Sequence, residues 1–167
     1  MFVAPEDVSG AVEGWFGRLS VDGLLHAVAH RWKTQMNENA KVPAFWDSQP
    51  EVCHNEVAGW GQHGDLTRQV ITLVNLRHDF EHPQVMARFD VTNDLVAEVV
   101  ASVTEVQAEG EGELAQLLDL ILVGDFTSTH LAMQEGVDPG PVPAIDHVKS
   151  AMANSAGERI SEGANEE

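Results

Sequence analysis

The sequence predicts an α/β fold with a mainly parallel sheet, and two stretches carry this prediction. Arg68 to Leu76 is a nearly continuous run of apolar and β-branched residues, as is typical of a strand covered on both faces. Ala101 to Ala108 alternates apolar and polar residues and is predicted as a second strand. Helical patterns surround both stretches, so we expect βαβ units with right-handed crossovers and ligand sites at the carboxyl ends of the strands.

The first half of the chain opens with a lead-in over residues 1–19, in which we expect one short helix near Val8 to Trp15. A longer helix is predicted from Ser20 onwards, because apolar residues recur at helical intervals at Leu24, Leu25, Val28, Trp32 and Met36. Val42 to Trp46 is short and apolar with a proline near its start, which favours an edge strand. Asn55 to Trp60 is predicted as a short helix.

The second half of the chain is mostly helical by pattern. His82 to Val100 is predicted as a helix with an interruption at Val91-Thr92, where Thr92 can cap a second segment. Glu113 to Gln134 has apolar residues on all sides and is predicted as a long, buried helix. A last helix is expected from Ala144 to about Ala153, followed by an acidic, disordered tail over residues 154–167.

Composition places the chain among globular proteins. Its 167 residues are 43% hydrophobic and 22% charged, which is ordinary for a single domain, expected here over residues 20–153. Nine Lys and Arg face 27 Asp and Glu, for a formal net charge of -18. Because this charge repels phosphate backbones and anionic lipid surfaces, neither nucleic acid nor a membrane is an expected partner. Any phosphate site must be a local cluster of donors.

The expected compartment follows from cysteine usage and from the amino-terminal residues. The single cysteine, Cys53, cannot form an internal disulfide. The opening residues MFVAPEDVSG lack the basic and then apolar segments of a signal peptide. No stretch approaches the roughly 18 consecutive apolar residues that a membrane-spanning helix needs. We therefore expect a cytoplasmic protein without a membrane span.

Three minor features each have a structural and a chemical interpretation. His26 and His30 share a helix flank and can bind a metal, but no third ligand is evident, and two solvated side chains are expected. The hydroxyls of residues 127–129 resemble a phosphate-binding run, yet in a buried helix they normally bond to the preceding turn. Cys53 has no basic neighbour that would activate its thiol, so packing is favoured over reactivity.

The stretch from Lys33 to Glu56 is the strongest candidate for chemistry. It places Glu38 and His54 at the ends of predicted elements, where open α/β folds position ligand-binding groups. The structural alternative is that Asn37 and Asn39 end a helix in left-handed backbone, while Glu38 is solvated and His54 caps the next turn. Spacing alone favours this alternative.

Four segments, taken in order, carry a family resemblance: RWKTQMNENAKVPAFW, PEVCHNEVAGW, AEGEGELAQLLDLILVGDFTSTHLAMQEGVDP and PVPAIDHVK. From about Leu24 to Met152 the chain resembles the C-terminal half of the bacterial and archaeal bifunctional phosphoglucose/phosphomannose isomerases. That family consists of two sugar isomerase (SIS) domains in tandem. The resemblance implies an SIS-type three-layer α/β/α sandwich with a mainly parallel sheet of about five strands.

The resemblance also implies roles for individual residues. Glu38 in NENAK matches the base that moves a proton between C1 and C2 of the sugar through a cis-enediol. His54 in HNE matches a ring-opening residue that is supplied to the neighbouring subunit, which implies a homodimer. Lys149 in PVPAIDHVK matches a lysine that assists ring opening near the ring oxygen. No metal or organic cofactor is implied.

One departure from the family pattern is large. The N-terminal SIS domain, which supplies hydroxyl residues for the sugar phosphate and an arginine for the enediolate, has no counterpart before the first matching helix. Without that clamp we expect turnover to suffer as well as affinity. The chain is therefore expected to be half of an isomerase for glucose 6-phosphate and mannose 6-phosphate, a natural single-domain relative that works with a separate N-terminal partner, or a non-catalytic sugar-phosphate-binding or assembly module.

Overall fold

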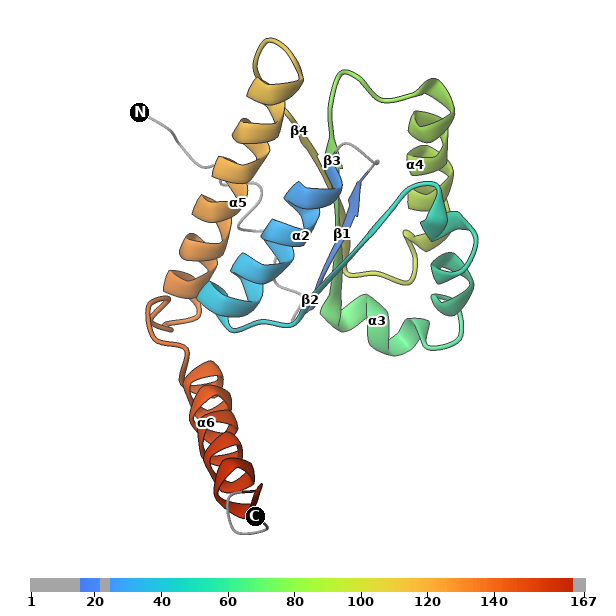
Figure 1. Ribbon diagram of the computed structural model, residues 1–167. Coiled ribbons are helices and arrows are strands. Elements are labelled where there is room, and N and C mark those ends of the chain that lie inside the picture. Colours follow the sequence, from blue (N-terminus) through green and yellow to red (C-terminus); the bar gives the residue numbers. More distant parts are fainter. Residues whose placement is uncertain (1–15, 22–24, 164–167) are drawn as a thin grey trace.

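The structure is a computed structural model, and it describes residues 16–21 and 25–163 (Figure 1). The short helix expected near Val8 to Trp15 lies outside the described residues. The strands are β1 (Phe16–Val21), β2 (Ala44–Ser48), β3 (Ile71–Arg77) and β4 (Ser102–Gln107). The α-helices are α2 (His26–Gln35), α3 (Gly64–Val70), α4 (Pro83–Val96), α5 (Glu113–Gln134) and α6 (Pro143–Gly163). A π-helical turn, η2 (Met36–Ala40), and two 3-10 helices, η3 (Glu51–Cys53) and η4 (Glu56–Gly59), complete the list.

The four strands of the described residues form one parallel sheet in the order β2-β1-β3-β4. Leu19 of β1 pairs with Trp46 of β2 on one side and with Val74 of β3 on the other. Helices α2 and α5 cover one face of the sheet, and α3 and α4 cover the other (Figure 1). The predicted α/β class, with its three layers and parallel sheet, is confirmed; the resemblance implied about five strands, and the described part contains four.

Strand β1 corrects the expected start of the ordered fold. Residues 16–19 were assigned to the lead-in, and the first helix was expected from Ser20, whereas Phe16–Val21 is a strand and α2 begins at His26. The segment FGRLSV contains Gly17 and Ser20, which are poor strand formers. It is a strand because β2 and β3 pair with it from both sides, so tertiary pairing overrides local propensity.

Two further elements, β3 and α4, differ from the predictions. The strand expected over residues 68–76 begins at Ile71, because the three residues before it close α3. Helix α4 runs without a break through Thr92, which is buried and caps nothing. The cap of α4 is His82, whose imidazole accepts a hydrogen bond from the backbone N–H of Gln84.

Helix α6 corrects the expected tail. It was predicted to end near Ala153, yet it continues to Gly163, so only residues 164–167 of the expected tail lie outside the described residues. The segment after Ala153 contains alanine, serine, glutamate and arginine, all of which tolerate helical backbone. Its polar composition alone did not predict that the helix continues. Figure 1 shows α6 projecting away from the sheet and its covering helices. Its side chains from residue 143 to residue 155 are all exposed.

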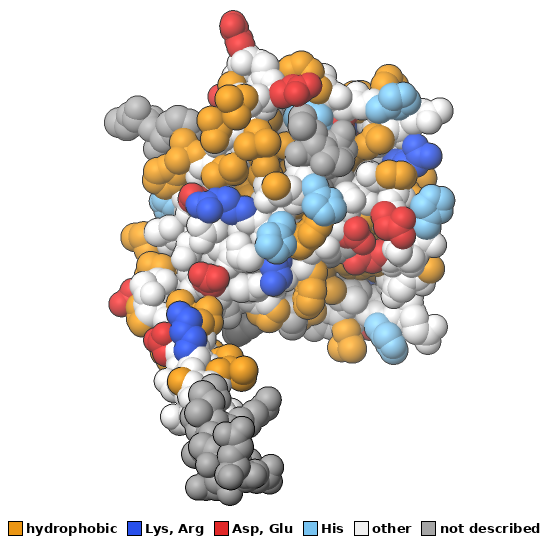
Figure 2. Space-filling model, in the orientation of Figure 1, with side chains coloured by type: hydrophobic (Ala, Val, Ile, Leu, Met, Phe, Trp, Pro, Cys, Tyr) orange, Lys and Arg blue, Asp and Glu red, His pale blue; other side chains and the backbone are white. Residues whose placement is uncertain are grey.

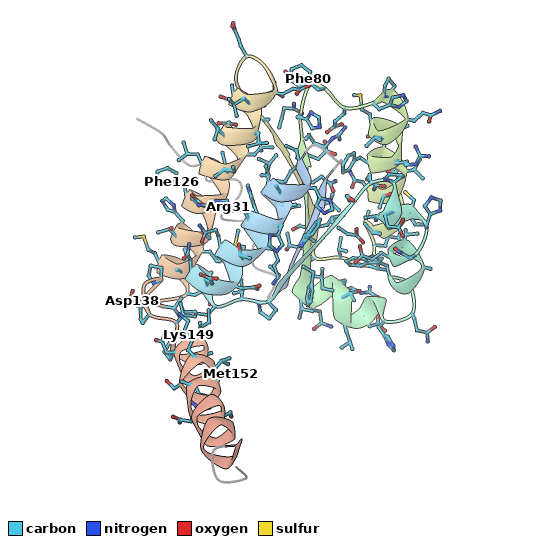
Figure 3. The ribbon with its side chains drawn as sticks, viewed as in Figure 1. Arg31, Phe80, Phe126, Asp138, Lys149 and Met152 are labelled. Atoms are coloured by element: carbon cyan, nitrogen blue, oxygen red, sulfur yellow. The ribbon has the colours of Figure 1, made fainter. Side chains whose placement is uncertain are left out.

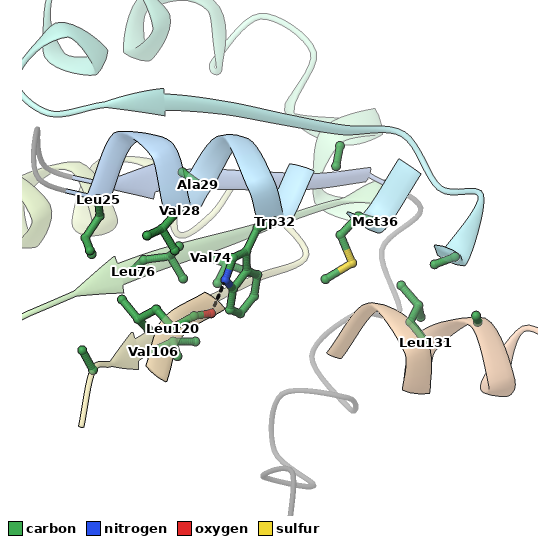
Figure 4. Close-up of a cluster of buried hydrophobic side chains, with 14 residues drawn as sticks. Leu25, Val28, Ala29, Trp32, Met36, Val74, Leu76, Val106, Leu120 and Leu131 are labelled. Atoms are coloured by element: carbon green, nitrogen blue, oxygen red, sulfur yellow. Dashed lines mark hydrogen bonds between the residues drawn. The ribbon is translucent and has the colours of Figure 1, made fainter. Parts of the chain in front are cut away.

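The larger core cluster lies between the sheet and the α2–α5 layer. Figure 4 shows Trp32 at its centre, with an indole Nε1 that donates a hydrogen bond to the Leu120 carbonyl at 2.6 Å. The ring lies directly over Gly124, where a Cβ atom would be only 2.4 Å from Nε1. A smaller cluster around Leu73 and Val96 fills the opposite face. None of the helices in the described residues combines the length and the apolar character needed to cross a membrane.

Candidate active site

The turn that carries Glu38 is fixed by the residues around it. Asn37 donates a side-chain hydrogen bond to the Val42 carbonyl at 2.8 Å, and Asn39 donates one to Ser128 Oγ on α5 at 2.9 Å. Lys41 adopts the left-handed conformation that closes η2, with φ at 61°, and its Nζ bonds to the Glu38 carbonyl. The alternative that the two asparagines take up left-handed backbone is therefore wrong. π-Helical turns of this kind are rare and are often found at functional sites.

The Glu38 side chain itself is exposed. Its carboxylate has no hydrogen-bond or ionic partner within residues 25–155, in contrast to the three side chains that hold the turn. The backbone of Glu38 is thus fixed while its carboxylate stays available. A carboxylate in water is a weak base for a carbon acid, so stronger basicity would require another body to close over this turn and remove water.

His54 lies in a loop that is anchored to α4. Cys53 Sγ is 3.1 Å from Gln49 Oε1 and 3.5 Å from Thr92 Oγ1, and the Gln49 amide nitrogen donates to the same Thr92 hydroxyl at 3.3 Å. Cys53 is therefore a packed, hydrogen-bonded residue, as the sequence favoured. The His54 imidazole is exposed, and in the described part of the chain it has no hydrogen-bond partner. His54 ends η3 as its C-cap residue, and the next helix, η4, is capped by Asn55 and not by His54.

Lys149 lies on the exposed part of α6 (Figure 3). Helix α5 runs back from the carboxyl edge of the sheet, so α6 leaves the body of the molecule at the amino edge. Within the described residues the Lys149 ammonium has no ionic partner.

The three predicted residues do not form one cluster. Glu38 precedes β2 and therefore lies at the amino edge of the parallel sheet, on the side covered by α2 and α5. His54 follows β2 at the carboxyl edge, and its loop is tied to α4 on the opposite face. The amino edge also carries the start of α6, and hence Lys149. Glu38 therefore does not lie at the carboxyl ends of the strands, where ligand groups were expected to gather.

An ion cluster at the carboxyl end of β3 was not singled out by the sequence. Arg77 donates to Glu81 through Nε and Nη2, at 2.9 and 2.8 Å, and to Glu105 through Nη1 at 2.8 Å. Its guanidinium also lies over the Phe89 ring, 4.4 Å from the ring centroid. The hydrogen bonds to Glu81 raise the pKa of Arg77 above its ordinary value. The available signal was an arginine ending a buried strand with a glutamate four residues later.

A second ion pair ties the turn-bearing helix α2 to α5. Arg31 Nη2 and Asp125 Oδ2 are 2.8 Å apart, and Gln35 donates to the other oxygen of Asp125 at 2.9 Å. The hydrogen bond with Asp125 raises the pKa of Arg31 above its ordinary value. These contacts, with the bond from Asn39 to Ser128, fix the end of α2 from which Glu38 projects.

The remaining minor features have structural roles. His26 and His30 contact the Trp46 ring, with centroids 4.2 and 5.8 Å from it. The described residues contain no group of three side chains that could hold a metal ion. Thr127 and Thr129 donate to the carbonyls of Val123 and Asp125, as expected for hydroxyls in a buried helix.

Comparisons with known proteins agree with one another. Residues 6–152 match the family described as the bacterial phospho-glucose isomerase C-terminal SIS domain. The chain is 35% identical over 136 residues to the bifunctional phosphoglucose/phosphomannose isomerase of Caldicellulosiruptor bescii, a match that covers 80% of this chain and 39% of that protein. The enzyme of the same name from Aquifex aeolicus is 30% identical over 151 residues, covering 90% of this chain and 47% of that one. The chain thus spans less than half the length of these relatives.

Solved structures share the fold. A glucose-6-phosphate isomerase like protein from Thermus thermophilus superposes with a TM-score of 0.66 at 20% identity, over 83% of this chain and 45% of that one. The C-terminal domain of glucosamine-fructose-6-phosphate aminotransferase from Francisella tularensis gives a TM-score of 0.62 at 10% identity, over 81% of this chain and 40% of that one.

Proposed function

Because the chain belongs to the bacterial phospho-glucose isomerase C-terminal SIS domain family, we propose that it is the catalytic-base half of an aldose–ketose isomerase for sugar phosphates. The reaction interconverts glucose 6-phosphate or mannose 6-phosphate with fructose 6-phosphate, in the cytoplasmic carbohydrate metabolism of glycolysis and gluconeogenesis. The chemistry is a proton transfer between neighbouring carbons.

Glu38 is the base in this proposal. Its carboxylate removes the proton from C2 of the open-chain aldose while O1 gains a proton, which gives a cis-enediol. The ketose forms when the carboxylate returns the proton to C1 and the hydroxyl on C2 gives up its proton, so that the net change is one hydrogen from C2 to C1 and one from O2 to O1. Lys149 assists opening of the sugar ring near the ring oxygen, and His54 supports ring opening in the neighbouring subunit. A positioned proton-transfer group of this kind typically contributes about 10² to 10⁴ in rate.

The observation that carries the proposal is the contrast within η2. Two of its side chains, together with that of Lys41 directly after it, hold the turn, and the one carboxylate that the chemistry needs is left without a partner in residues 25–155. A glutamate that is only solvated would not need a turn that neighbouring side chains fix in this way. The same availability at His54 and Lys149 supports their assignment as reacting groups.

The separation of His54 from Glu38 supports a homodimer in which His54 enters the partner's site. The two residues are on opposite faces and at opposite edges of one sheet, so a single chain does not bring them together. The exposure of Glu38 supports a further requirement. A second body, such as the N-terminal SIS domain, would cover the turn, raise the basicity of the carboxylate by excluding water, and bind the phosphate.

The alternative function is a non-catalytic module that binds sugar phosphates or assembles with other SIS domains. The observation that favours it is the exposure of Glu38, because a solvated carboxylate is a weak base for a carbon acid. In this case Glu38 would have no effect on turnover, and a sugar phosphate would bind without being converted.

The test is formation of fructose 6-phosphate from glucose 6-phosphate and from mannose 6-phosphate by the wild-type chain and by Glu38→Gln. Glu98→Gln, which removes an exposed carboxylate on the other side of the molecule, is the matched control. We expect Glu38→Gln to lower kcat by about 10² or more and the control to leave it unchanged. Equal and measurable rates for Glu38→Gln and wild type refute the catalytic role. Calorimetric binding of a sugar phosphate without turnover identifies the alternative.

A further inference from the structure

The hydroxyl of Thr92 faces the loop that carries His54. A threonine inside a helix normally donates its hydroxyl hydrogen to the carbonyl of the preceding turn, as Thr127 does in α5. Thr92 lies inside α4 with 6% of its surface exposed. Its hydroxyl oxygen contacts two side chains of the loop, Gln49 at 3.3 Å and Cys53 at 3.5 Å. Helix α4 therefore directs a buried polar group at this loop.

The side chains of Gln49, Cys53 and Thr92 form a closed ring of hydrogen bonds. The Gln49 amide nitrogen donates to Thr92 Oγ1, and the Cys53 thiol donates its one hydrogen to Gln49 Oε1 at 3.1 Å. The remaining contact, between Cys53 Sγ and Thr92 Oγ1, therefore uses the threonine hydrogen. Gln49 is only 3% exposed. Removal of the threonine hydroxyl would leave this buried amide without its acceptor, which favours movement of the loop.

The ring fixes the backbone directly before His54, and further contacts fix the backbone around it. The His54 N–H donates to the Glu51 carbonyl at 2.9 Å. Asn55 donates a side-chain hydrogen bond to Glu51 Oε1 at 2.8 Å and accepts one from the N–H of Glu56. The His54 imidazole is exposed and, among the described residues, has no hydrogen-bond partner. Figure 2 shows acidic (red) and histidine (pale blue) side chains at the surface on the side of the molecule where η3 and η4 lie.

A fixed backbone with a free side chain is also the arrangement at Glu38. At both positions the neighbouring side chains are used for hydrogen bonds, and the side chain that the proposed chemistry needs is not. We propose that Thr92 is a positioning residue for His54 and that it acts through the hydrogen-bond ring with Gln49 and Cys53. The role given to His54 rests on the proposed function, whereas the ring is a property of the fold.

Positioning from α4 matters because His54 would act outside its own subunit. A side chain that enters a neighbouring site is aimed by the loop that carries it, so a shift of this loop displaces the imidazole from the sugar. A misplacement of about 1 Å can lower a rate by about 10². Thr92 itself is buried and touches no substrate in this arrangement, so it affects the reaction only through His54.

Nuclear magnetic resonance of the full chain tests the proposal without requiring turnover. Thr92→Val keeps the shape of the side chain and removes its hydroxyl. We expect it to lower the order parameter of the His54 amide from about 0.85, typical of rigid backbone, to below about 0.6, and Thr92→Ser to keep the wild-type value. Thr127→Val is the matched control, because Thr127 is similarly buried in a helix but bonds to its own preceding turn. An order parameter that stays high in Thr92→Val, or that falls equally in the control, overturns the proposal.

A second pair of variants covers the case in which Thr92→Val fails to fold. Cys53 is only half-buried, so its replacement is tolerated more easily. Cys53→Ser keeps a group that can donate to Gln49 and accept from Thr92, whereas Cys53→Ala removes the member of the ring that adjoins His54. We expect Cys53→Ala to loosen the His54 amide and Cys53→Ser to leave it rigid. Equal order parameters in these two variants contradict the ring as the means of positioning.

Turnover distinguishes positioning from a general loss of structure. In the isomerase assay we expect Thr92→Val to lower kcat by about 10- to 100-fold and to have no further effect in a His54→Ala background, because a positioning residue acts only through the residue that it positions. Effects that multiply in the double variant overturn the proposal. A chain whose measurable turnover is unaffected by Glu38→Gln refutes the proposed function, and the order parameters of His54 still decide whether Thr92 positions it.

Discussion

Replacing Gly124 by alanine should destabilise the fold, although alanine is the better helix former. The added methyl group would lie 2.4 Å from Trp32 Nε1 and 2.6 Å from Trp32 Cδ1, where carbon contacts are not tolerated. Trp32 is 1% exposed and is held by its hydrogen bond to the Leu120 carbonyl. The indole cannot move aside without losing that bond and disturbing the centre of the core.

The expected magnitude follows from three contributions. Overpacking a core costs about 1–3 kcal/mol, and loss of the indole hydrogen bond costs about 1 kcal/mol more. Removing a glycine from the interior of a helix returns about 1 kcal/mol. The net loss in the free energy of unfolding is therefore about 1–3 kcal/mol. For a chain of this size, each kcal/mol lowers Tm by about 2–4 °C.

Urea unfolding followed by tryptophan fluorescence, with Tm from circular dichroism, measures the effect. Gly59→Ala is the control, because nothing lies within 4 Å of a Cβ at that position, and its stability should stay within about 0.5 kcal/mol of wild type. In a Trp32→Leu background, Gly124→Ala should lose its cost, because the ring that it meets is gone. A Gly124→Ala variant as stable as wild type in the normal background would refute the packing argument.

Two other changes test the contacts around the candidate site and the ion cluster. Asn39→Ala should lower the free energy of unfolding by about 1 kcal/mol through its bond to Ser128, while Glu38→Gln should leave stability unchanged, as urea titrations of both would show. Arg77→Met should cost about 3–5 kcal/mol, because it leaves Glu81 buried and unpaired, and combining it with Glu81→Leu should recover much of the loss. A cost below about 1 kcal/mol for Arg77→Met would contradict that account.

The sequence predicts the fold class correctly because buried elements have long runs of apolar residues. β3 is buried on both faces and appears as an apolar run, and α5 appears as a long apolar helix. β1 was missed because its residues favour no structure by themselves and become a strand through pairing with β2 and β3. α6 was shortened in the prediction because an acidic, polar composition is shared by disordered chains and exposed helices.

The candidate site depended on resemblance more than on sequence pattern. Glu38, His54 and Lys149 were selected by resemblance, since spacing alone favoured ordinary structural roles for the first two. Glu38 and His54 are only 16 positions apart in the sequence. They are nevertheless separated in space, because the chain crosses the sheet along β2 between them, and the sequence did not predict this separation. The ion cluster around Arg77 joins β3, β4 and the loop before α4, and such convergence appears only once the strands are paired.

The number of residues in the π-helical turn from Met36 to Ala40 sets the direction in which the Glu38 side chain points. A π-helical turn is an α-helix that has accepted one extra residue. Deleting one residue before Glu38 would let the helix continue regularly, yet each residue rotates an α-helix by about 100°, so the carboxylate would point a quarter-turn or more away. Chains that differ in length within this turn therefore cannot present the same carboxylate in the same direction, whatever residue they carry there. An alignment gap inside NENAK would be a stronger warning of lost chemistry than a conservative substitution beside it.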